Sequence, residues 1–309
     1  MKSINKKSVD IVIPVYEEKE HLATIIDNLT KQSIPPNYVL NIIIVDDAST
    51  DGTPEYIEKN LLSETVSLIK LEKNSGPAVA RNKGCLAGNG DILVLIDADC
   101  LPDSSDFIAE HIQALKKNDI SCGAMASNIP DSIFWSQYQN EVFENRAAEY
   151  NKNKGSMFTT SNLAFSRNHF IQVSGFDEQY FFGFEDRDFL LRSEEAGALI
   201  TYTSKALVVH IDRLTVTSIC KKMKRGGEVE SNIFRKRHPE AYKIMPYYKV
   251  DAREHAYLVP IAKFVAPLFS SQSSHLDKVL KWNWFPYKLK KLMVKGMTAL
   301  CYMSGTAKS

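Results

Sequence analysis

Cysteine is scarce and irregularly placed in this 309-residue sequence. The five cysteines are odd in number, and no two of them are spaced as a CxxC pair. Disulfide-rich secreted domains and zinc knuckles depend on regularly paired cysteines, so the sequence predicts neither. Scattered free cysteines are typical of a reducing compartment, and we expect a cytoplasmic protein.

Long apolar runs are also missing. Spanning a bilayer takes about 18 or more consecutive apolar residues. Lys263 and Lys295 interrupt the two candidate runs near the C-terminus. The first apolar run, Val9–Val15, contains Asp10 and Pro14, unlike the core of an export signal. We therefore predict neither a membrane span nor an export signal.

Charge is balanced overall but not along the chain. The sequence holds 38 Lys and Arg against 37 Asp and Glu, and its 44% of hydrophobic residues suffice for a sizeable core. Residues 1–220 carry 20 basic and 31 acidic residues, whereas residues 221–309 carry 18 basic and 6 acidic ones. We expect the acidic and basic parts to face different partners.

The first hundred residues alternate between short apolar runs and helical patterns. Four runs rich in Val, Ile and Leu are typical of strands buried on both faces of a parallel sheet: 9–15, 40–46, 66–71 and 92–97. Between the first two runs, apolar residues repeat with helical spacing at positions 22, 25, 26 and 29. This alternation predicts an α/β fold with a mostly parallel sheet flanked by helices.

The later part of the chain mixes strands and helices before its pattern changes. We expect strands at about 120–129, 159–166 and 205–210, and helices at about 104–118, 132–150 and 185–195. From Pro239 onward five prolines interrupt the sequence, and Ser270–Ser274 resembles a hinge. We predict one domain over 1–240 and a helical, basic appendage over 241–309.

Polar motifs follow three of the four early strands. They are Pro14–Glu18, Asp46–Thr53 and Asp97–Asp99. Ligands of open parallel sheets bind beyond the carboxyl ends of the strands, so we expect one site to collect all three motifs.

These motifs, with two others, resemble the inverting glycosyltransferases of family 2. The matching segments, within about residues 1–240, are Pro14–Glu18, Val45–Thr53, Asn74–Gly84, Asp97–Asp99 and Gly183–Asp188. The resemblance implies a GT-A fold, which is a Rossmann-like sheet flanked by helices, together with a nucleotide-sugar donor and a divalent cation, Mn²⁺ or Mg²⁺.

Two carboxylates form the candidate metal site. Asp97 and Asp99 point the same way in an extended chain, so they can hold a hard cation against a diphosphate. The resemblance makes Asp99 the main metal ligand and gives Asp97 either the ribose or the outer shell of the ion. It also suggests His210, which ends a predicted strand, as a further ligand; a structural histidine is the alternative.

We expect the ends of the first two strands to bind the donor. Asp46 and Asp47 can accept hydrogen bonds from a base or a ribose, a role that the resemblance also assigns to them, with Asp47 the stronger candidate. Tyr16 can stack on the base, and Pro14 fixes the backbone beside it. Glu18 keeps the acid of the family motif. Glu17 stands where the family has Asn. It either contacts the donor or is a solvated acid at the start of a helix.

The segment before the fourth strand suggests a diphosphate contact. Gly76 begins a tight turn into a helix whose first amides, with Arg81, can face the diphosphate. Arg81 can equally pair with a nearby carboxylate for structural reasons.

An acidic cluster supplies the candidate base. Inverting transfer needs a carboxylate that removes the proton of the acceptor hydroxyl as that oxygen attacks. The resemblance assigns this task to Asp186, with Glu185 orienting the acceptor or the base. Phe184 can stack on a sugar face. Asn162 lies in a segment that resembles the strand lining the sugar pocket, where it would contact donor or acceptor.

The basic C-terminal part suggests a surface partner. Lysines alternate with aromatic and aliphatic residues over 278–295, a composition that suits an anionic membrane surface. A basic face of a docked helical tail is the alternative. We recognise no nucleic-acid-binding module and expect no nucleic-acid partner.

The sequence therefore predicts metal-dependent inverting transfer of a hexose-type sugar from a nucleoside diphosphate, with UDP expected, to a hydroxyl of a glycan or glycolipid. Peripheral contact with the inner face of the membrane would suit a lipid-linked acceptor. Two alternatives are a nucleotidyltransferase that makes the nucleotide sugar, and a non-catalytic glycan-binding subunit of a polysaccharide assembly complex. The first normally has a Gly-rich loop with Arg after the first strand, which Pro14–Glu18 lacks.

Overall fold

A computed structural model describes residues 6–129, 132–153, 159–211 and 213–307. The chain forms two compact units. The first unit, called the sheet unit here, contains residues 1–128, 139–181 and 185–212. The second, called the helical unit, contains residues 129–138, 182–184 and 213–309. The predicted division at residue 240 falls inside the helical unit, and the predicted extent of the transferase domain stays a prediction.

The sheet unit is built on one eight-stranded sheet. Its strands are β1 (Lys7–Val15), β2 (Tyr38–Asp46), β3 (Val66–Lys70), β4 (Ile92–Ile96), β5 (Cys100–Pro102), β6 (Ile120–Ser127), β7 (Asn162–Ser166) and β8 (Ile200–His210). The helices of this unit include α1 (Leu22–Thr30), α2 (Thr53–Asn60), α3 (Pro77–Ala87), α4 (Phe107–Ala114), α6 (Arg167–Gln172) and α7 (Glu185–Glu195). The long helix α5 (Ile133–Asn153) begins in the helical unit and continues into the sheet unit.

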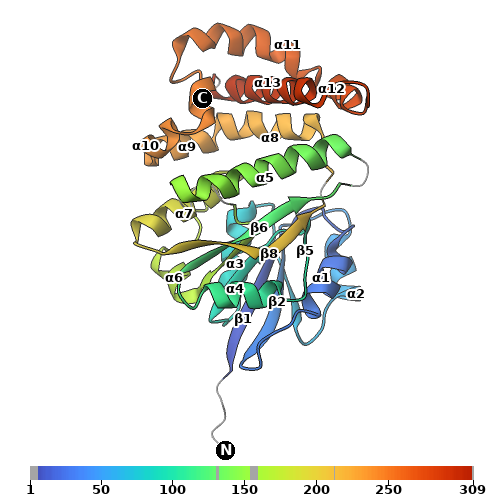
Figure 1. The fold of residues 1–309 in the computed structure, drawn as a ribbon, viewed down its shortest axis with the longest axis vertical. Helices are drawn as coiled ribbons and strands as arrows, with labels where there is room; N and C mark the ends of the chain where they lie inside the picture. The colour runs from blue at the N-terminus through green and yellow to red at the C-terminus, as the bar shows by residue number, and fades with distance from the viewer. Residues whose placement is uncertain (1–5, 130–131, 154–158, 212, 308–309) are drawn as a thin grey trace, which may run out of the picture. The chain divides into compact units, whose positions relative to one another are not determined.

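The strand order is β3-β2-β1-β4-β7-β6-β8-β5. Figure 1 labels β1, β2, β5, β6 and β8 of this sheet. Strands β1 to β4 pair in parallel, as do β6 and β8, while β7 and β5 run antiparallel to their neighbours. The carboxyl ends of β1, β2, β4, β6 and β8 therefore lie at one edge of the sheet, together with the starts of β7 and β5. We call this the catalytic edge below, because the predicted site residues cluster there.

Helices cover both faces of the sheet. One face packs apolar residues of β1 and β4 against α1, α2 and α4. The other packs alternate residues of the same strands against α3, α6 and α7. Both faces of the central strands are therefore buried, which explains why these strands are almost continuously apolar in the sequence.

The helical unit has its own apolar core, in which α5 and α8 pack with α12 and α13. Its helices are α8 (Val216–Glu228), α9 (Glu230–Arg237), α10 (Pro239–Lys243), η2 (Pro246–Val250), η3 (Ala256–Leu258), η4 (Ile261–Val265), α11 (Ala266–Ser270), α12 (Ser273–Leu280) and α13 (Tyr287–Thr306). Helices α8 and α13 approach closely at two glycines: a Cβ on Gly305 would lie 2.1 Å from the carbonyl oxygen of Lys224, and one on Gly227 would lie 2.5 Å from that of Tyr302. Within the described residues, no helix is both long and apolar enough to cross a membrane.

The predicted α/β fold class is confirmed. The four early strands and the helix over 185–195 lie where the periodicity places them, with ends that differ by at most two residues. The three-residue strand β5, which pairs with the end of β8, was not predicted, because its Pro102 and short length give no periodic signal. The predicted hinge near residue 272 coincides with the break between α11 and α12.

Candidate active site

The topology brings the polar motifs to the catalytic edge. Val15, Asp46 and Ile96 end three neighbouring strands there, and His210 ends β8. The antiparallel pairing of β7 with β4 sets Asn162 opposite Ile96. We expected one site along this edge from the parallel strands alone. The antiparallel strands β7 and β5 also begin at this edge, with Asn162 and Cys100.

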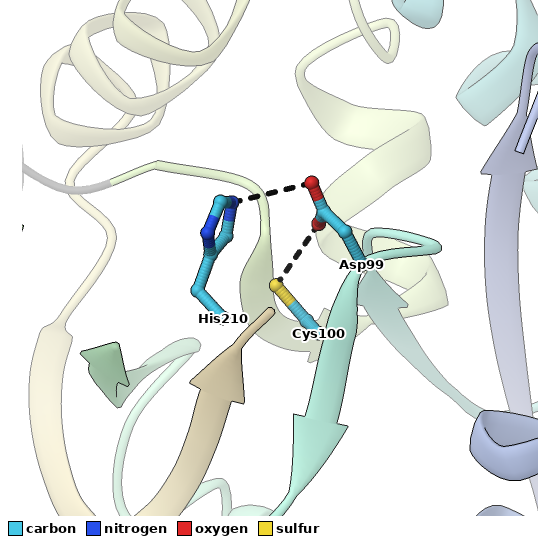
Figure 2. A group of neighbouring side chains, drawn as sticks. All are labelled: Asp99, Cys100 and His210. Atoms are coloured by element: carbon cyan, nitrogen blue, oxygen red, sulfur yellow. Dashed lines mark hydrogen bonds and ion pairs between the residues drawn. The ribbon is translucent and has the colours of Figure 1, made fainter. Parts of the chain in front are cut away.

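Asp99 and His210 form the candidate metal centre (Figure 2). The Nε2 atom of His210 lies 3.2 Å from Oδ2 of Asp99, although the two residues are 111 positions apart in the sequence. The Sγ atom of Cys100 lies 3.5 Å from the other carboxylate oxygen, Oδ1. Ligand atoms of all three residues lie within 4.8 Å of one another.

The chemistry of these donors favours a hard cation. Burial and the neighbouring carboxylate of Asp99 raise the pKa of Cys100 well above its usual range, so this residue remains a thiol and donates to Asp99. Asp99 and His210 are partly exposed, which leaves room for oxygen atoms of a ligand. A carboxylate and an imidazole with open positions fit a cation such as Mn²⁺.

Gln139 orients the imidazole from its far side. The side-chain amide nitrogen of Gln139 lies 3.3 Å from Nδ1 of His210, and its oxygen accepts from the hydroxyl of Ser127 at 2.5 Å. In this arrangement Nδ1 is an acceptor and Nε2 carries the proton. Cation binding through Nε2 requires the proton to be on Nδ1, so the amide of Gln139 must then turn its oxygen toward Nδ1 to accept a hydrogen bond. The Ser127 hydroxyl can accept as well as donate, so every group keeps a partner after that exchange.

Arg81 links two acids of the candidate site. They are Asp97, the first acid of the Asp97–Asp99 motif (called the DxD motif below), and Glu185, which lies beside the predicted base Asp186. One of the terminal nitrogens of Arg81 lies 2.9 Å from Asp97, and the other lies 3.1 Å from Glu185. Burial opposes its charge, but Asp97, Glu185 and Asp186 together raise the pKa of Arg81 above its usual value. Of the two roles considered for Arg81, the structure therefore shows pairing with carboxylates. The second oxygen of Asp97 accepts from the hydroxyl of Ser161 at 2.6 Å.

Glu185 and Asp186 differ in their surroundings. Glu185 is buried, and its Oε2 atom has no hydrogen-bond partner within the described residues. Burial and the adjacent Asp186 raise the pKa of Glu185 to about 7. Asp186 is half-buried and accepts from the backbone amide of Arg187 at 2.8 Å. Both lie in the first turn of α7, where the helix dipole favours negative charge.

Asp46 and Asp47 are both buried at the end of β2. Asp47 accepts from the backbone amides of Ser75 and Gly76, each at 2.7 Å, and burial raises its pKa despite these bonds. These two amides precede α3, so the amide of Gly76 is bonded to Asp47 here, and a diphosphate contact of the first amides of α3 stays a prediction. Gly76 has a φ of 89°, and a Cβ there would lie 2.1 Å from the carbonyl oxygen of Phe181. Only glycine fits this turn.

The loop after β1 is tied to the loop after β2. Glu17, which has a φ of 51°, donates its amide to Ser49 at 2.8 Å and accepts from Thr50 at 3.1 Å. The acid that departs from the family motif therefore braces two loops. Tyr16 stays 46% exposed beside it, available to a ligand, whereas Pro14 is half-buried within β1. Glu18 is half-buried, next in the chain after the loop-bracing acid.

Asn162 is buried among strands. It donates to the carbonyl oxygens of Ala124 and Ala206 at 2.8 and 2.9 Å, and its own oxygen lies 2.9 Å from Nε2 of His111. Burial lowers the pKa of His111 to about 4, so this histidine is neutral. The described contacts of the Asn162 side chain thus hold β6, β7 and β8 together, and its sugar contact stays a prediction.

Phe184 has a left-handed backbone, with a φ of 71°, directly before α7. It belongs to the helical unit, where its ring packs against Phe234 and Tyr247 at centroid distances of 5.2 and 5.9 Å. Its predicted sugar contact is not among these contacts and stays a prediction.

Sequence reasoning missed Cys100 and Gln139, and it did not name Asp97 and Glu185 as the carboxylates that pair with Arg81. Cys100 directly follows the DxD motif, but a lone cysteine carries no signal of its own. Gln139 lies 71 residues from His210, so no local pattern connects them. Ser161 directly precedes Asn162 in the segment that the resemblance singled out, and its hydroxyl donates to Asp97. Its place in that segment is the sequence signal that could have led to it.

Comparison with known proteins decides the family. The model of the glycosyl transferase family 2 matches residues 10–174, more than half of the chain. The chain belongs to glycosyl transferase family 2. The predicted resemblance is confirmed, and the match spans β1 to α6 with the DxD motif. A second family model, the N-terminal domain of galactosyltransferase, matches residues 143–215 and so spans α7 and the end of β8.

Among related proteins, the uncharacterized glycosyltransferase YfnE of Bacillus subtilis is 24% identical over 276 residues, covering 72% of this chain and 68% of YfnE. Dolichyl-phosphate beta-glucosyltransferase of Dictyostelium discoideum is 30% identical over 148 residues, covering 41% of this chain and 44% of that protein. The chain thus matches less than half of this second relative.

The fold resembles that of a solved mannosyltransferase. The structure of mannosyltransferase PcManGT from Pyrobaculum calidifontis, in complex with GDP-Man and Mn²⁺, aligns with a TM-score of 0.59 at 19% identity, covering 98% of this chain and 86% of that one. The similarity confirms the GT-A fold.

Proposed function

We propose that this protein is a metal-dependent inverting glycosyltransferase. It moves a hexose-type sugar from a nucleoside diphosphate, UDP in our proposal, to a hydroxyl group of a glycan or glycolipid. One observation carries the proposal: the catalytic edge holds an Asp99–His210 pair and an Arg81 that joins Asp97 to Glu185. Family membership supports the reaction class.

The cation site is assigned to Asp99 and His210. Their separation of 3.2 Å and partial exposure suit two ligands of one ion, with the diphosphate supplying further oxygens. A bound divalent cation would stabilise the charge that develops on the leaving diphosphate. PcManGT, which has the same fold, was solved with Mn²⁺. We therefore propose Mn²⁺ or Mg²⁺.

Asp186 acts as the general base in this proposal. Its carboxylate accepts the proton of the acceptor hydroxyl while that oxygen bonds to the anomeric carbon from the face opposite the diphosphate. The bond between the anomeric carbon and the diphosphate oxygen breaks, and the configuration inverts. Arg81 keeps a positive charge beside this cluster.

Glu185 is a positioning residue in this proposal. Its Oε1 atom is bonded to Arg81, while its buried Oε2 has no partner within the described residues. With a pKa raised to about 7, Glu185 is about half protonated at neutral pH. A protonated Glu185 places one negative charge fewer beside Asp186.

The acceptor class rests on relatives. The name of the Dictyostelium relative specifies a lipid phosphate acceptor, dolichyl phosphate. We propose an acceptor hydroxyl on a lipid-linked or growing glycan.

The decisive experiment separates donor binding from transfer. Asp186→Asn is expected to abolish transfer, by about 10³-fold or more, while Mn²⁺-dependent binding of the nucleotide stays within about twofold, because an amide cannot take the proton. Transfer is measured against a panel of UDP- and GDP-sugars with Mn²⁺ or Mg²⁺.

Asp106→Asn is a matched control, because Asp106 is an exposed acid in the same unit. It should leave both measurements unchanged. Full turnover by Asp186→Asn would refute the base assignment. Metal-dependent nucleotide binding without any transfer by the unmodified protein would instead favour the glycan-binding alternative.

A further inference from the structure

The helical unit exposes a cluster of large apolar side chains. Trp282 and Trp284 follow α12, are 46% and 75% exposed, and stack on each other with ring centroids 5.5 Å apart. Leu289, Leu292 and Met293, in the first turns of α13, are also exposed. Isolated exposed apolar residues are ordinary, but five within 12 residues form a patch that needs a partner.

The spacing on α13 explains the patch. Residues 290, 294, 297 and 301 are buried and repeat with helical spacing, so they form the face that packs into the unit. Residues 289, 292, 293 and 296 lie outside this buried face and are exposed. This half of α13 therefore has an apolar strip on its exposed surface in addition to its buried face.

Lysines surround the patch. Lys278, Lys281, Lys288 and Lys295 are exposed, and the sequence contains no acidic residue after Asp277. Lys290 is different: it is buried and donates to the carbonyl oxygen of Leu280 at 2.8 Å, so it caps α12. The structure thus removes one lysine from the predicted 278–295 surface and leaves the others at its border.

We propose that Trp282, Trp284, Leu289, Leu292 and Met293, with the exposed lysines beside them, form a surface that binds an anionic lipid bilayer. We call it the bilayer surface. Tryptophan is suited to the headgroup region because it combines a large apolar ring with a polar N–H, and lysines attract acidic headgroups. Contact is peripheral, with α13 lying in the interface. It is independent of the chemistry proposed above.

Charge complementarity selects this occupant. A second copy of the chain would bring the same lysines together and repel itself. An acidic protein partner would satisfy the lysines but gains little from exposed tryptophans beside them, whereas a bilayer receives both groups at once. Helix α11, which contacts α13, adds exposed Leu268 to the same unit (Figure 1).

The chain carries its own reporter for this test. It has three tryptophans: Trp135 is buried, and the other two belong to the bilayer surface. Vesicles of phosphatidylcholine with phosphatidylglycerol should shift the fluorescence of the full chain to shorter wavelength and pellet it on sedimentation. Pure phosphatidylcholine vesicles should do so much less. Added salt should weaken binding, because screening reduces the attraction of the lysines.

Substitutions then assign the surface. Leu292→Gln keeps the tryptophans and should lower partitioning about tenfold, while Lys288→Ala and Lys295→Ala should each lower it about fivefold. Leu199→Gln and Lys205→Ala, at exposed positions of the sheet unit, should change nothing. All five positions are exposed, so circular dichroism should show unchanged folding.

Three results would overturn the proposal: no binding to anionic vesicles at low salt, equal binding to neutral vesicles, or losses in the control variants as large as those in the surface variants. Sugar transfer to a water-soluble acceptor is measured in parallel. Loss of vesicle binding with retained transfer separates this surface from the proposed active site.

Discussion

Each unit contains a buried cluster of charged residues, and the two clusters differ in how fully they are bonded. In the helical unit, Asp251 accepts from Tyr242 at 2.6 Å and from Arg253 at 2.7 Å. Burial favours its neutral form, but these hydrogen bonds outweigh burial and lower the pKa of Asp251. In the sheet unit, Glu185 leaves one buried oxygen without a partner within the described residues, and its pKa is raised to about 7.

The two acids differ in how many of their hydrogen bonds are made. A buried carboxylate with a full set of hydrogen bonds stabilises one conformation, whereas a buried oxygen without a partner can still accept a proton or a hydrogen bond. Incomplete bonding alone does not mark a site, because Glu230 of the helical unit also has a buried oxygen without a partner within the described residues and a raised pKa. Glu185 differs from Glu230 in its place, since Arg81 joins it to Asp97 at the catalytic edge.

The largest effect is expected from breaking the bonded cluster of the helical unit, which consists of Asp251, Tyr242 and Arg253. Asp251→Ala leaves Arg253 buried and uncompensated and should lower the free energy of unfolding of the helical unit by about 3–5 kcal/mol. All three tryptophans belong to this unit, so their fluorescence in a denaturant titration reports its unfolding. Ala307→Ser, near the end of α13, is a mild control. A change below about 1 kcal/mol for Asp251→Ala would contradict the comparison.

The next effect concerns the cation site. Mn²⁺ at a hundred times its dissociation constant should stabilise the sheet unit by about 2.7 kcal/mol, because it binds the folded state. Asp99→Asn should remove this stabilisation, and Asp251→Asn should keep it. Thermal melting with and without Mn²⁺ measures both. Undiminished stabilisation of Asp99→Asn would exclude Asp99 as a main ligand.

The third effect is a pH dependence of stability, which is small per pH unit and accumulates over several units. Because the native pKa of Glu185 is about 7 and the ordinary pKa of a glutamate is 4.5, the native state binds more protons between these values. Stability should therefore fall as pH rises from about 4.5 to 7, by at most about 1.4 kcal/mol per pH unit, and then level off. Glu185→Gln should flatten this slope in denaturant titrations followed by circular dichroism. Glu195→Gln, at an exposed position of the same helix, should retain it.

The sequence predicted the elements whose signal is local. Strands β1 and β4 and the second half of β2 are buried on both faces, so their apolar runs are visible without any partner. Helix α7 begins at an acidic turn and ends before Gly197. The motifs at the carboxyl ends of the parallel strands could be assigned to one edge, because parallel strands must end together. The family followed from the order of those motifs.

Tertiary structure alone decided the partners. Arg81 meets Glu185 across 104 residues, and Asp99 meets His210 across 111, which no local pattern encodes. The raised pKa of Glu185 follows from burial, and the bonding of Asp47 to the turn before α3 follows from how two loops meet. Sequence by itself determined which acids this protein carries to the catalytic edge; packing decided which of them are bonded to one another and which keep an open oxygen, because burial and distance exist only in the folded chain.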